Sequence, residues 1–389
     1  MATNLRPTLA DPELPPDVLA EMERLNDDAA HLNIWLRTHA NATMHPPWHR
    51  PDAPPSTRPG RAKPALWKWA DFEPYLHRIA AIAPLEFTER QQFLLMNPGF
   101  GGQLKVTNSI RVAVSIYKPG DDAPTHQHTP NASRTILSNA GGYTTVEGER
   151  CTAHRGDLIL TPNGTWHGHG NDDEEPVIWI DVLDWPVLEY FDQIWIDHDF
   201  PESPGGAGGN TAPFSDGLSG KLFGSGGILP RAPGVPRGRG RGNSPMFHYQ
   251  GTNIRKTLEG MRDLEGTPWD AITVDFANPA TGGAIFATLG YAATLLRPGE
   301  ATADSRSTAG TFFTCISGRG WTEVGGQRLE WGPNDLFVVP NHTWFRHVNA
   351  SADEDAVIYA ISDRPLLEKI GHYRRQGRNA DGTVVELDA

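Results

Sequence analysis

The chain has 389 residues, of which 21% are charged and 38% hydrophobic, and its formal net charge is −13. This length and composition exclude wholesale disorder and allow two globular domains, each with a core of its own. The negative balance argues against a nucleic-acid partner, whose phosphates require a basic surface. It leaves room for an anionic small molecule in a locally basic pocket.

The cysteine count and the absence of apolar runs bear on the compartment. The two cysteines, Cys151 and Cys315, lie far apart, so no disulfide framework is expected. The N-terminus lacks the basic start and apolar run of a signal peptide. No apolar stretch approaches the ~20 residues that span a bilayer. We therefore expect a soluble, cytoplasmic protein without a membrane partner.

Helical patterns are confined to the front of the chain. Residues 12–40 indicate an amphipathic helix followed by a short second helix, and residues 70–96 indicate one or two more. Residues 41–63, between them, are rich in proline and predict an extended arm.

The pattern changes from about residue 100 to residue 185. Short runs rich in β-branched and aromatic residues alternate there with turns, which is typical of an antiparallel sandwich or jelly roll. These runs are RVAVSIY, SRTILSN, GYTTVEG, DLILTP and VIWIDVL. Residues 201–245 are rich in glycine and proline and predict a linker.

The β pattern returns after the linker as an internal duplication. The run WTEVGGQRLEWGPNDLFVVPNHTWFRHVN parallels YTTVEGERCTAHRGDLILTPNGTWHGHGN, and GYAATLLRPGEATADSRST parallels VAVSIYKPGDDAPTHQHTP, at an offset of about 178–179 residues. Such a repeat implies two copies of one β-fold. The expected parts are an N-terminal helical and extended arm (1–85), a first β domain (86–200), the linker (201–245), a second β domain (246–375) and a C-terminal tail (376–389).

Three histidines of the first copy form a candidate metal site. His126 and His128 stand two residues apart on a predicted strand, so their side chains point to the same face. His167 follows on a strand that neighbours the first in a jelly roll. Three neutral imidazoles suit ferrous iron, zinc, copper or nickel, and the open coordination positions suit catalysis. We predict that these three side chains bind one catalytic metal ion.

The second copy lacks these ligands. Ser305, Ser307 and Phe345 occupy the equivalent positions, and none of them is a competent iron ligand. The second copy should therefore bind no metal there. His347 aligns with His169 of the first copy and is interpreted as a structural or surface histidine.

These motifs resemble those of the cupin superfamily and, within it, the bicupin gentisate 1,2-dioxygenases and their relatives that act on salicylate and 1-hydroxy-2-naphthoate. The resemblance spans most of residues 65–375 and includes LWKW, ERQQFLLMNPGF, HQHTPNASRTIL and GDLILTPNGTWHGHGND. It implies a mainly β fold with two cupin (jelly-roll β-barrel) domains behind an N-terminal helical extension. The usual cupin carries a glutamate four to five residues after its His-x-His pair, a place that Ser133 holds here.

The resemblance also implies a function. It points to an Fe(II)-dependent dioxygenase that inserts O2 between the carboxyl- and hydroxyl-bearing carbons of an ortho-hydroxy aromatic carboxylate. Gentisate, a substituted salicylate and 1-hydroxy-2-naphthoate are the candidate substrates, and a homotetramer is the expected assembly. Two other interpretations stay open: another cupin metalloenzyme, such as an isomerase or a non-ring-cleaving dioxygenase, and a non-catalytic acid-binding bicupin.

Two arginines are candidates for binding the substrate carboxylate, because a guanidinium offers a bidentate fork. Arg134 lies six residues past His128 with the same strand parity, and Arg90 occupies a position where the family carries a second substrate-binding arginine. The alternative for each is a surface or salt-bridging arginine.

Four further residues complete the predicted site. His169, two residues after a predicted ligand, is a candidate acid or base, or a core histidine. Asp181 aligns with an aspartate that the family places near the ring substituents. Arg111 and Ser115 stand where gentisate enzymes usually have tryptophan and glutamine. Both replacements should alter the pocket wall and the preference for gentisate.

Overall fold

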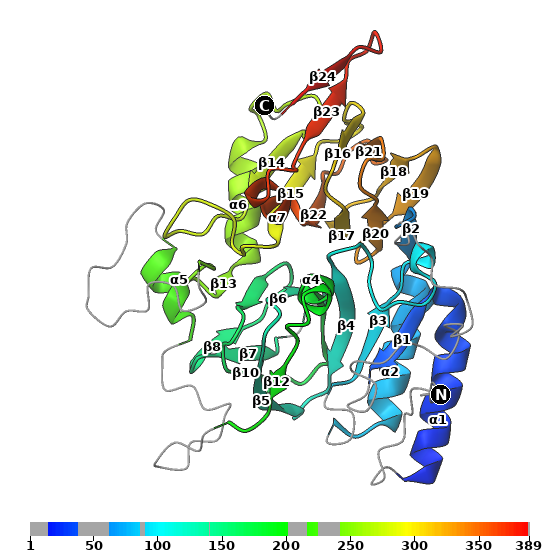
Figure 1. Cartoon of the computed structure of the whole chain (residues 1–389), viewed down its shortest axis with the longest axis vertical. Coiled ribbons are helices and arrows are strands. Elements are labelled where there is room, and N and C mark those ends of the chain that lie inside the picture. Colours follow the sequence, from blue (N-terminus) through cyan, green and yellow to red (C-terminus); the bar gives the residue numbers. More distant parts are fainter. Residues whose placement is uncertain are drawn as a thin grey trace.

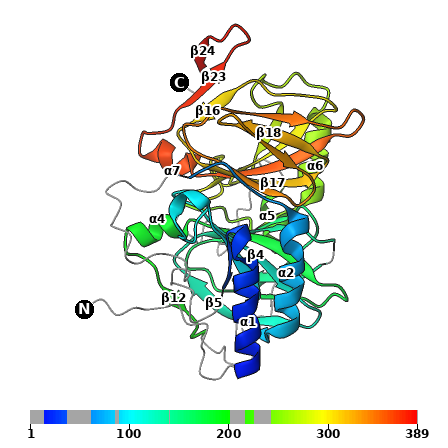
Figure 2. The ribbon, with the colours of Figure 1, turned by 90° about the vertical axis from the view of Figure 1, so that its right-hand side faces the viewer.

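The computed structural model describes residues 15–37, 62–85, 90–139, 141–200, 216–224 and 242–387. Two antiparallel β halves lie one above the other in Figure 1, the N-terminal half below and the C-terminal half above. Helices α1 (Pro16–Ala29) and α2 (Trp69–Ile82) run side by side along the N-terminal half (Figure 2). The predicted mainly β fold, in two copies with an N-terminal helical extension, is confirmed.

The N-terminal half packs a seven-stranded sheet against a five-stranded sheet. The order in the larger sheet is β1 (Ile34–Arg37), β3 (Gln92–Leu95), β4 (Arg111–Tyr117), β11 (Val177–Leu183), β6 (Ala132–Ile136), β9 (Leu158–Thr161) and β13 (His248–Tyr249). The order in the smaller sheet is β12 (Ile196–Asp197), β5 (Asp122–His128), β10 (His167–Gly170), β7 (Tyr143–Val146) and β8 (Glu149–Thr152). The predicted runs RVAVSIY and VIWIDVL are β4 and β11, so the strand pattern of the first copy is confirmed.

The C-terminal half repeats this arrangement with two six-stranded sheets. One has the order β14 (Ile272–Asp275), β15 (Gly290–Leu296), β22 (Ala356–Ser362), β17 (Thr311–Ser317), β20 (Leu336–Val339) and β2 (Ala65–Trp67). The other has the order β19 (Gln327–Trp331), β18 (Gly320–Val324), β21 (Phe345–Asn349), β16 (Ser305–Ser307), β23 (Arg375–Arg378) and β24 (Val384–Glu386). The segment expected to be a C-terminal tail therefore carries most of a hairpin that extends this sheet (Figure 1).

The remaining helices are short connections. They are η1 (Ala30–Leu32), η2 (Pro98–Phe100), α4 (Trp185–Tyr190), α5 (Leu218–Phe223), α6 (Gly251–Met261) and α7 (Arg364–Lys369). Helix α5 lies within the predicted linker, most of which falls outside the described residues. No helix among the described residues is long and apolar enough to cross a membrane.

Two helix predictions were wrong at their C-terminal ends. The helical pattern of residues 12–40 ends at Leu32, and the next residues form β1. The pattern of residues 70–96 ends with α2, and the run QFLL forms β3. All four β3 side chains are buried, so this strand reads as a continuous apolar run, which periodicity cannot distinguish from a buried helix. The predicted extended arm lies largely outside the described residues.

Each half receives an edge strand from a segment of the chain outside its own run of strands. Strand β2, from the N-terminal region, pairs with β20 of the C-terminal half. Strand β13, which follows the linker, pairs with β9 of the N-terminal half. The two halves are therefore linked by exchanged backbone ladders as well as by side chains.

Two equivalent aspartates fasten these exchanged segments. Asp335 Oδ1 accepts a hydrogen bond of 2.7 Å from the amide of Trp69 at the start of α2, and its other oxygen pairs with Lys68. Asp157 Oδ1 accepts one of 2.7 Å from the amide of Gly251 at the start of α6. A carboxylate is favoured at a helix N-terminus because the free amides and the helix dipole attract negative charge.

We expect Asp335→Ala to lower the free energy of unfolding by about 1–3 kcal/mol, because it removes the acceptor at the start of α2 and leaves buried donors unpaired. Urea denaturation of the full chain measures this. The control is Asp172→Ala, whose pair with Arg150 has side chains 65% and 34% exposed. That variant should change stability by less than ~0.5 kcal/mol. Equal losses in both variants would contradict the fastening role of Asp335.

Candidate metal centre

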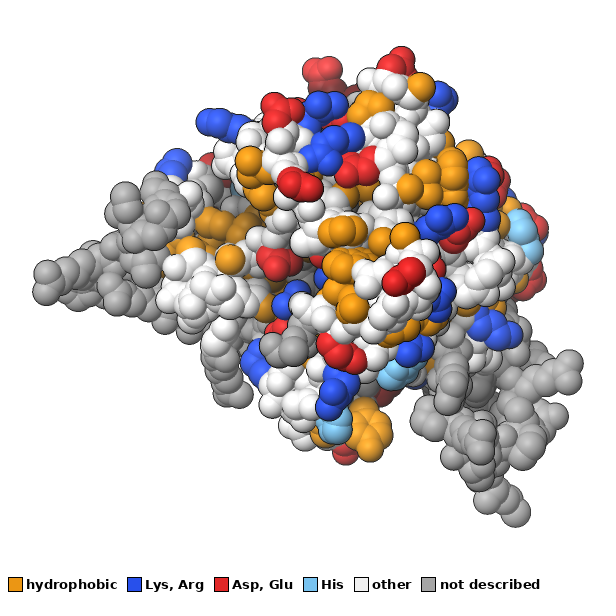
Figure 3. All heavy atoms as spheres, turned by 90° about the horizontal axis from the view of Figure 1, so that it is seen from above, with side chains coloured by type: hydrophobic (Ala, Val, Ile, Leu, Met, Phe, Trp, Pro, Cys, Tyr) orange, Lys and Arg blue, Asp and Glu red, His pale blue; other side chains and the backbone are white. Residues whose placement is uncertain are grey.

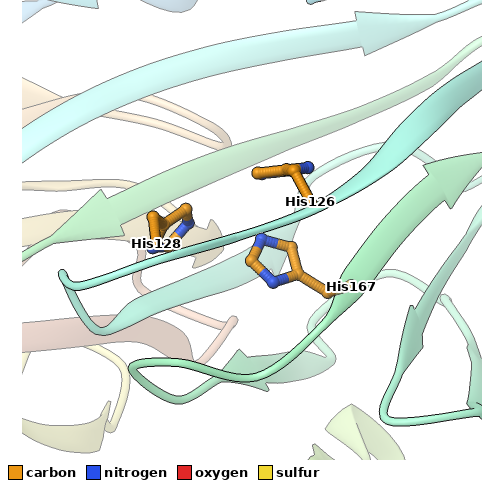
Figure 4. Close-up of side chains that lie close together, drawn as sticks. All are labelled: His126, His128 and His167. Carbon is orange, nitrogen blue, oxygen red and sulfur yellow. The ribbon is translucent and has the colours of Figure 1, made fainter. Parts of the chain in front are cut away.

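The three predicted ligands converge because of the pairing between β5 and β10. His167 lies directly opposite His126 in the ladder, and His128 is two residues along the same strand. All three side chains are buried, and their candidate ligand atoms lie within 4.8 Å of one another. Figure 4 shows the three rings gathered around one space between the two strands. The structure therefore brings together the site predicted from the sequence.

Backbone carbonyls orient all three rings. Nδ1 of His126 donates to the Pro124 oxygen at 3.1 Å. Nδ1 of His128 and of His167 donate to the carbonyl oxygens of Pro130 and Thr165, each at 2.8 Å. A carbonyl can only accept, so Nδ1 carries the proton in each ring and the lone pair of the neutral imidazole is on Nε2. This is how proteins orient metal-binding histidines.

The charge state of the rings also fits a metal ion. Burial, followed by Arg90 and the neighbouring imidazoles, holds the pKa of His126 well below its usual value. Burial and the same cluster of rings lower the pKa of His167 in the same way. Nε2 of His167 is a buried nitrogen without a hydrogen-bond partner among the described residues. A neutral imidazole with an unsatisfied lone pair is the form that binds a divalent metal.

The position of the usual cupin glutamate needs a correction. Ser133 does not face the metal centre: its hydroxyl makes a 2.6 Å hydrogen bond with that of Tyr291 in the C-terminal half. The neighbouring Ala132 has the opposite parity and lines the space beside His128. The side chain that faces the site at this position is therefore the methyl group of Ala132. Strand β6 offers the metal no carboxylate ligand.

A small cavity adjoins the metal centre. Its volume is about 40 Å³, and its polar lining includes three arginines, Arg90, Arg111 and Arg134, with a single carboxylate, that of Asp181. The other lining residues are Gln92, Leu94, Ala113, His128, Ala132, Leu183, Trp185 and Ile196. An acidic protein thus has a cationic cavity, as an anionic ligand requires.

Each arginine is held differently. Arg134 is buried, with Nε 3.1 Å from an Asp181 oxygen and Nη1 donating to Thr161 at 2.7 Å. Burial lowers its pKa to about 10, so it stays charged at neutral pH. Arg111 donates to the Leu104 oxygen at 3.0 Å and packs over the Trp185 ring. Arg90 lies against the ring nitrogens of a metal ligand, His126.

The other predicted residues lie around the same space. His169 is buried with its ring centroid 5.6 Å from that of His167, and its Nδ1 is 3.0 Å from Thr144 Oγ1. Its Nε2 has no hydrogen-bond partner among the described residues. Ser115 donates to Asp181 at 2.5 Å and is not itself among the cavity-lining residues, so it acts on the cavity through that carboxylate.

One neighbouring residue was missed by the sequence analysis. The ring of His198 stacks near that of His126, with centroids 5.8 Å apart. It follows β12, whose register places Ile196 opposite His128 and the next residues toward His126. A lone histidine just after a two-residue strand carries no sequence signal, because only the pairing of β12 with β5 brings it to the site.

The equivalent place in the C-terminal half holds different side chains. Ser305 lies opposite Phe345 in the β16–β21 ladder, as His126 lies opposite His167. His347 is buried rather than on the surface, and its Nδ1 is 2.8 Å from Thr322 Oγ1. The structural interpretation of His347 therefore holds, and the surface alternative is wrong.

Comparisons with known proteins agree with this geometry. A family model described as "Cupin domain" matches residues 113–183 and 294–362. The 5-aminosalicylate 1,2-dioxygenase of Comamonas sp is 33% identical over 364 residues, which cover 91% of each protein. The gentisate 1,2-dioxygenase of Ralstonia sp is 30% identical and covers 94% of this chain and 95% of that protein.

A solved structure gives the same result for the fold. The salicylate 1,2-dioxygenase of Pseudoaminobacter salicylatoxidans, determined with gentisate, superposes with a TM-score of 0.73 at 25% identity. The superposition covers 95% of this chain and 96% of that one. The similarity therefore extends over both halves and is not limited to one barrel.

We expect His167→Ala to reduce the metal bound per chain at least roughly tenfold, because even changes to residues that only orient a ligand reduce metal affinity by about that much. Metal content after reconstitution and desalting, measured by plasma mass spectrometry, checks this. His154→Ala is the matched control, since that imidazole is 69% exposed and lies outside the cluster. Undiminished metal in His167→Ala would contradict the assignment.

Proposed function

The chain belongs to the bicupin gentisate 1,2-dioxygenase family, and from this premise we propose that His126, His128 and His167 hold one Fe(II). The reaction is a ring-cleaving 1,2-dioxygenation of an ortho-hydroxy aromatic carboxylate. The observation that carries the proposal is the convergence of three buried imidazoles, with their candidate ligand atoms within 4.8 Å of one another, beside a cavity with three arginines and one carboxylate.

The reaction class supports iron over zinc. Bound at the three imidazoles, Fe(II) would supply the electron transfer and the open coordination positions that dioxygen and a chelating substrate require. Zinc fits the same ligands but has no redox couple. The protein contributes the orientation of the rings, through the carbonyls that hold their Nδ1 protons.

We propose that Arg90 and Arg134 bind the substrate carboxylate. Arg90 touches His126, so a carboxylate at the metal falls within its reach. Arg134 lines the same cavity next to Ala132. A guanidinium can bind both oxygens of a carboxylate at once, which fixes the plane of the acid and thereby the ring. Three arginines and one carboxylate line the cavity, so a substrate carboxylate would enter a site with an excess of positive charge.

His169 and Asp181 have roles that follow from their partners. We propose that His169, whose Nδ1 is held by the Thr144 hydroxyl, directs Nε2 toward the substrate and offers it a hydrogen bond. Asp181, held by Arg134 and Ser115 on the two neighbouring strands, is proposed to face the ring substituents of the substrate. Arg111 and Trp185 form a stacked wall beside them.

The side chains that line the cavity favour a single-ring substrate. Large residues such as Leu94, Leu183 and Trp185 leave little room for a second ring. We propose gentisate or a salicylate with a polar substituent as substrate, before 1-hydroxy-2-naphthoate. The relatives named 5-aminosalicylate and gentisate 1,2-dioxygenase also cover more of the chain than the 1-hydroxy-2-naphthoate enzyme of Nocardioides sp., at 29% identity and 79% coverage.

We expect oxygen consumption with gentisate, salicylate or 5-aminosalicylate after loading with ferrous iron under reductant, with one O2 used per ring opened. The rate with 1-hydroxy-2-naphthoate should be lower, since a second ring must displace wall residues. An oxygen electrode and the absorbance of the ring-opened product measure both. Full iron occupancy without uptake of oxygen for any of these acids would favour another cupin metalloenzyme or an acid-binding bicupin.

We expect Arg134→Lys to raise the substrate dissociation constant about tenfold or more, because a point charge replaces a bidentate fork. Calorimetry of substrate binding to the iron-loaded protein under argon measures the dissociation constant without oxygen. The effect on binding is thereby separated from any effect on turnover. Arg150→Lys, at an arginine paired with Asp172 on the surface, is the matched control. Unchanged affinity in Arg134→Lys would show that this arginine serves Asp181 alone.

The assembly and compartment remain expectations. We propose a cytoplasmic homotetramer, which the family resemblance implies. Light scattering on the purified protein measures the assembly, and a monomer at micromolar concentration would exclude it.

A further inference from the structure

A cavity of about 350 Å³, partly open to solvent, enters the barrel of the C-terminal half. Its walls are alternate residues of the barrel strands, such as Ala292 on β15, Phe313 on β17, Phe345 on β21 and Ala360 on β22. This is the place in the second copy where the first copy builds its metal centre. The inference concerns this cavity and does not depend on the reaction proposed for the N-terminal half.

Substitutions at equivalent positions explain why this barrel is hollow. Phe313 and Ala360 are cross-strand partners, as Arg134 and Asp181 are in the first copy. Gly290 begins β15 where Arg111 begins β4, which removes another long side chain. The second copy has therefore lost an ion pair and a wall arginine, and the cavity grows from about 40 to about 350 Å³. This volume is typical of small-molecule sites.

The surfaces left behind are aromatic. Phe313, Phe345 and the ring of His347 meet at the cavity, with the His347 centroid 5.0 Å from Phe313 and 5.2 Å from Phe345 in edge-to-face geometry. Aromatic rings packed in this way favour another ring as the next neighbour. A flat aromatic molecule thus matches the walls.

A hydrogen-bond relay sets which edge of His347 faces the cavity. Trp331 Nε1, which can only donate, gives its hydrogen to Thr322 Oγ1 at 3.0 Å. Thr322 Oγ1 also makes a 2.8 Å hydrogen bond with Nδ1 of His347. Burial lowers the pKa of His347 to about 3, so the ring is neutral and carries a single proton. Because Thr322 holds Nδ1, the Nε2 edge of the ring is directed away from Thr322, and we infer that the proton is on Nε2.

Both arginines that line the cavity are paired with carboxylates, and the remaining charged lining residue, Asp275, is itself a carboxylate. Arg375 binds both carboxylate oxygens of Asp270, at 2.5 and 3.1 Å. Arg364 donates to Glu368 at 2.6 Å. Figure 3, which looks down on this end of the molecule, likewise shows basic and acidic side chains mixed over the face. Because these arginines are paired with carboxylates, the cavity does not favour an anionic ligand. The cavity of the first copy, with three arginines and one carboxylate, does.

We propose that the C-terminal barrel is a second, metal-independent binding site for an uncharged single-ring aromatic molecule with an acceptor oxygen, such as a phenol. The ring packs against the side chains of Phe313 and Phe345, and the oxygen accepts the Nε2 hydrogen of His347. The C-terminal half, which lacks the metal ligands, thus has the same barrel as the N-terminal half but prefers a different ligand.

Matched variants at equivalent positions test this. Phenol binding to the iron-loaded full chain is followed by ligand-observed NMR and calorimetry. Ala292→Phe fills the C-terminal cavity and should weaken phenol binding at least about tenfold while ring cleavage is retained. Ala113→Phe, the equivalent change beside the metal centre, should abolish ring cleavage while phenol binding is retained. Ala360→Phe repeats the first test if Ala292→Phe fails to fold.

The chemical preference provides an independent measurement. Phenol should bind roughly fivefold more tightly than toluene, and this preference should disappear in His347→Phe, because the donor is lost. Benzoate should bind more weakly than phenol. The proposal is overturned if phenol does not bind to the wild-type chain, if Ala292→Phe and Ala360→Phe leave its affinity unchanged, or if Ala113→Phe abolishes it.

Discussion

The chemistry of this protein depends on the register between β5 and β10. Because His167 lies opposite His126, two strands deliver three imidazoles to one side of the sheet. A slip of one residue would turn a whole set of side chains to the other face. The irregularity between His167 and His169 lies on the β5 side only, since β10 pairs evenly with β7. Both histidines of β10 therefore stay inside the barrel.

The exchanged edge strands explain how two copies of one fold form a single molecule. Strand β2 completes the C-terminal half and β13 completes the N-terminal half, and Asp335 and Asp157 fasten the helices that follow them. With the scaffold secured in this way, the interiors of the two barrels were free to diverge. One concentrates three buried arginines, the carboxylate of Asp181 and three buried histidines, an arrangement that suits an anionic ligand beside a metal ion. The other replaces these groups with small and aromatic side chains and is left hollow.

Much of the fold and the ligand set was predictable from local patterns. The strands RVAVSIY and VIWIDVL were found because turns bound them and β-branched residues fill them. The pair His126 and His128 was found because alternate residues of a strand share a face. Local patterns failed where burial hides the period, as in the run QFLL, which is a central strand. Local patterns also assigned the position of the usual cupin glutamate to Ser133, whereas Ala132 is the residue that faces the site. The choice between these neighbours depends on strand parity.

The sequence by itself determined the duplication, the ligand types in each copy and the parity that sends Arg134 inward, because all of these depend on spacing along one chain. Only the tertiary structure decided which strands are neighbours. Pairing across the sheet brought His198 beside His126, placed Asp181 against Arg134 and tied His347 to Trp331 through Thr322. Contacts of this kind join residues far apart in the chain, and side-chain volumes on opposite walls decide whether a barrel is filled or hollow. No local pattern contains that information.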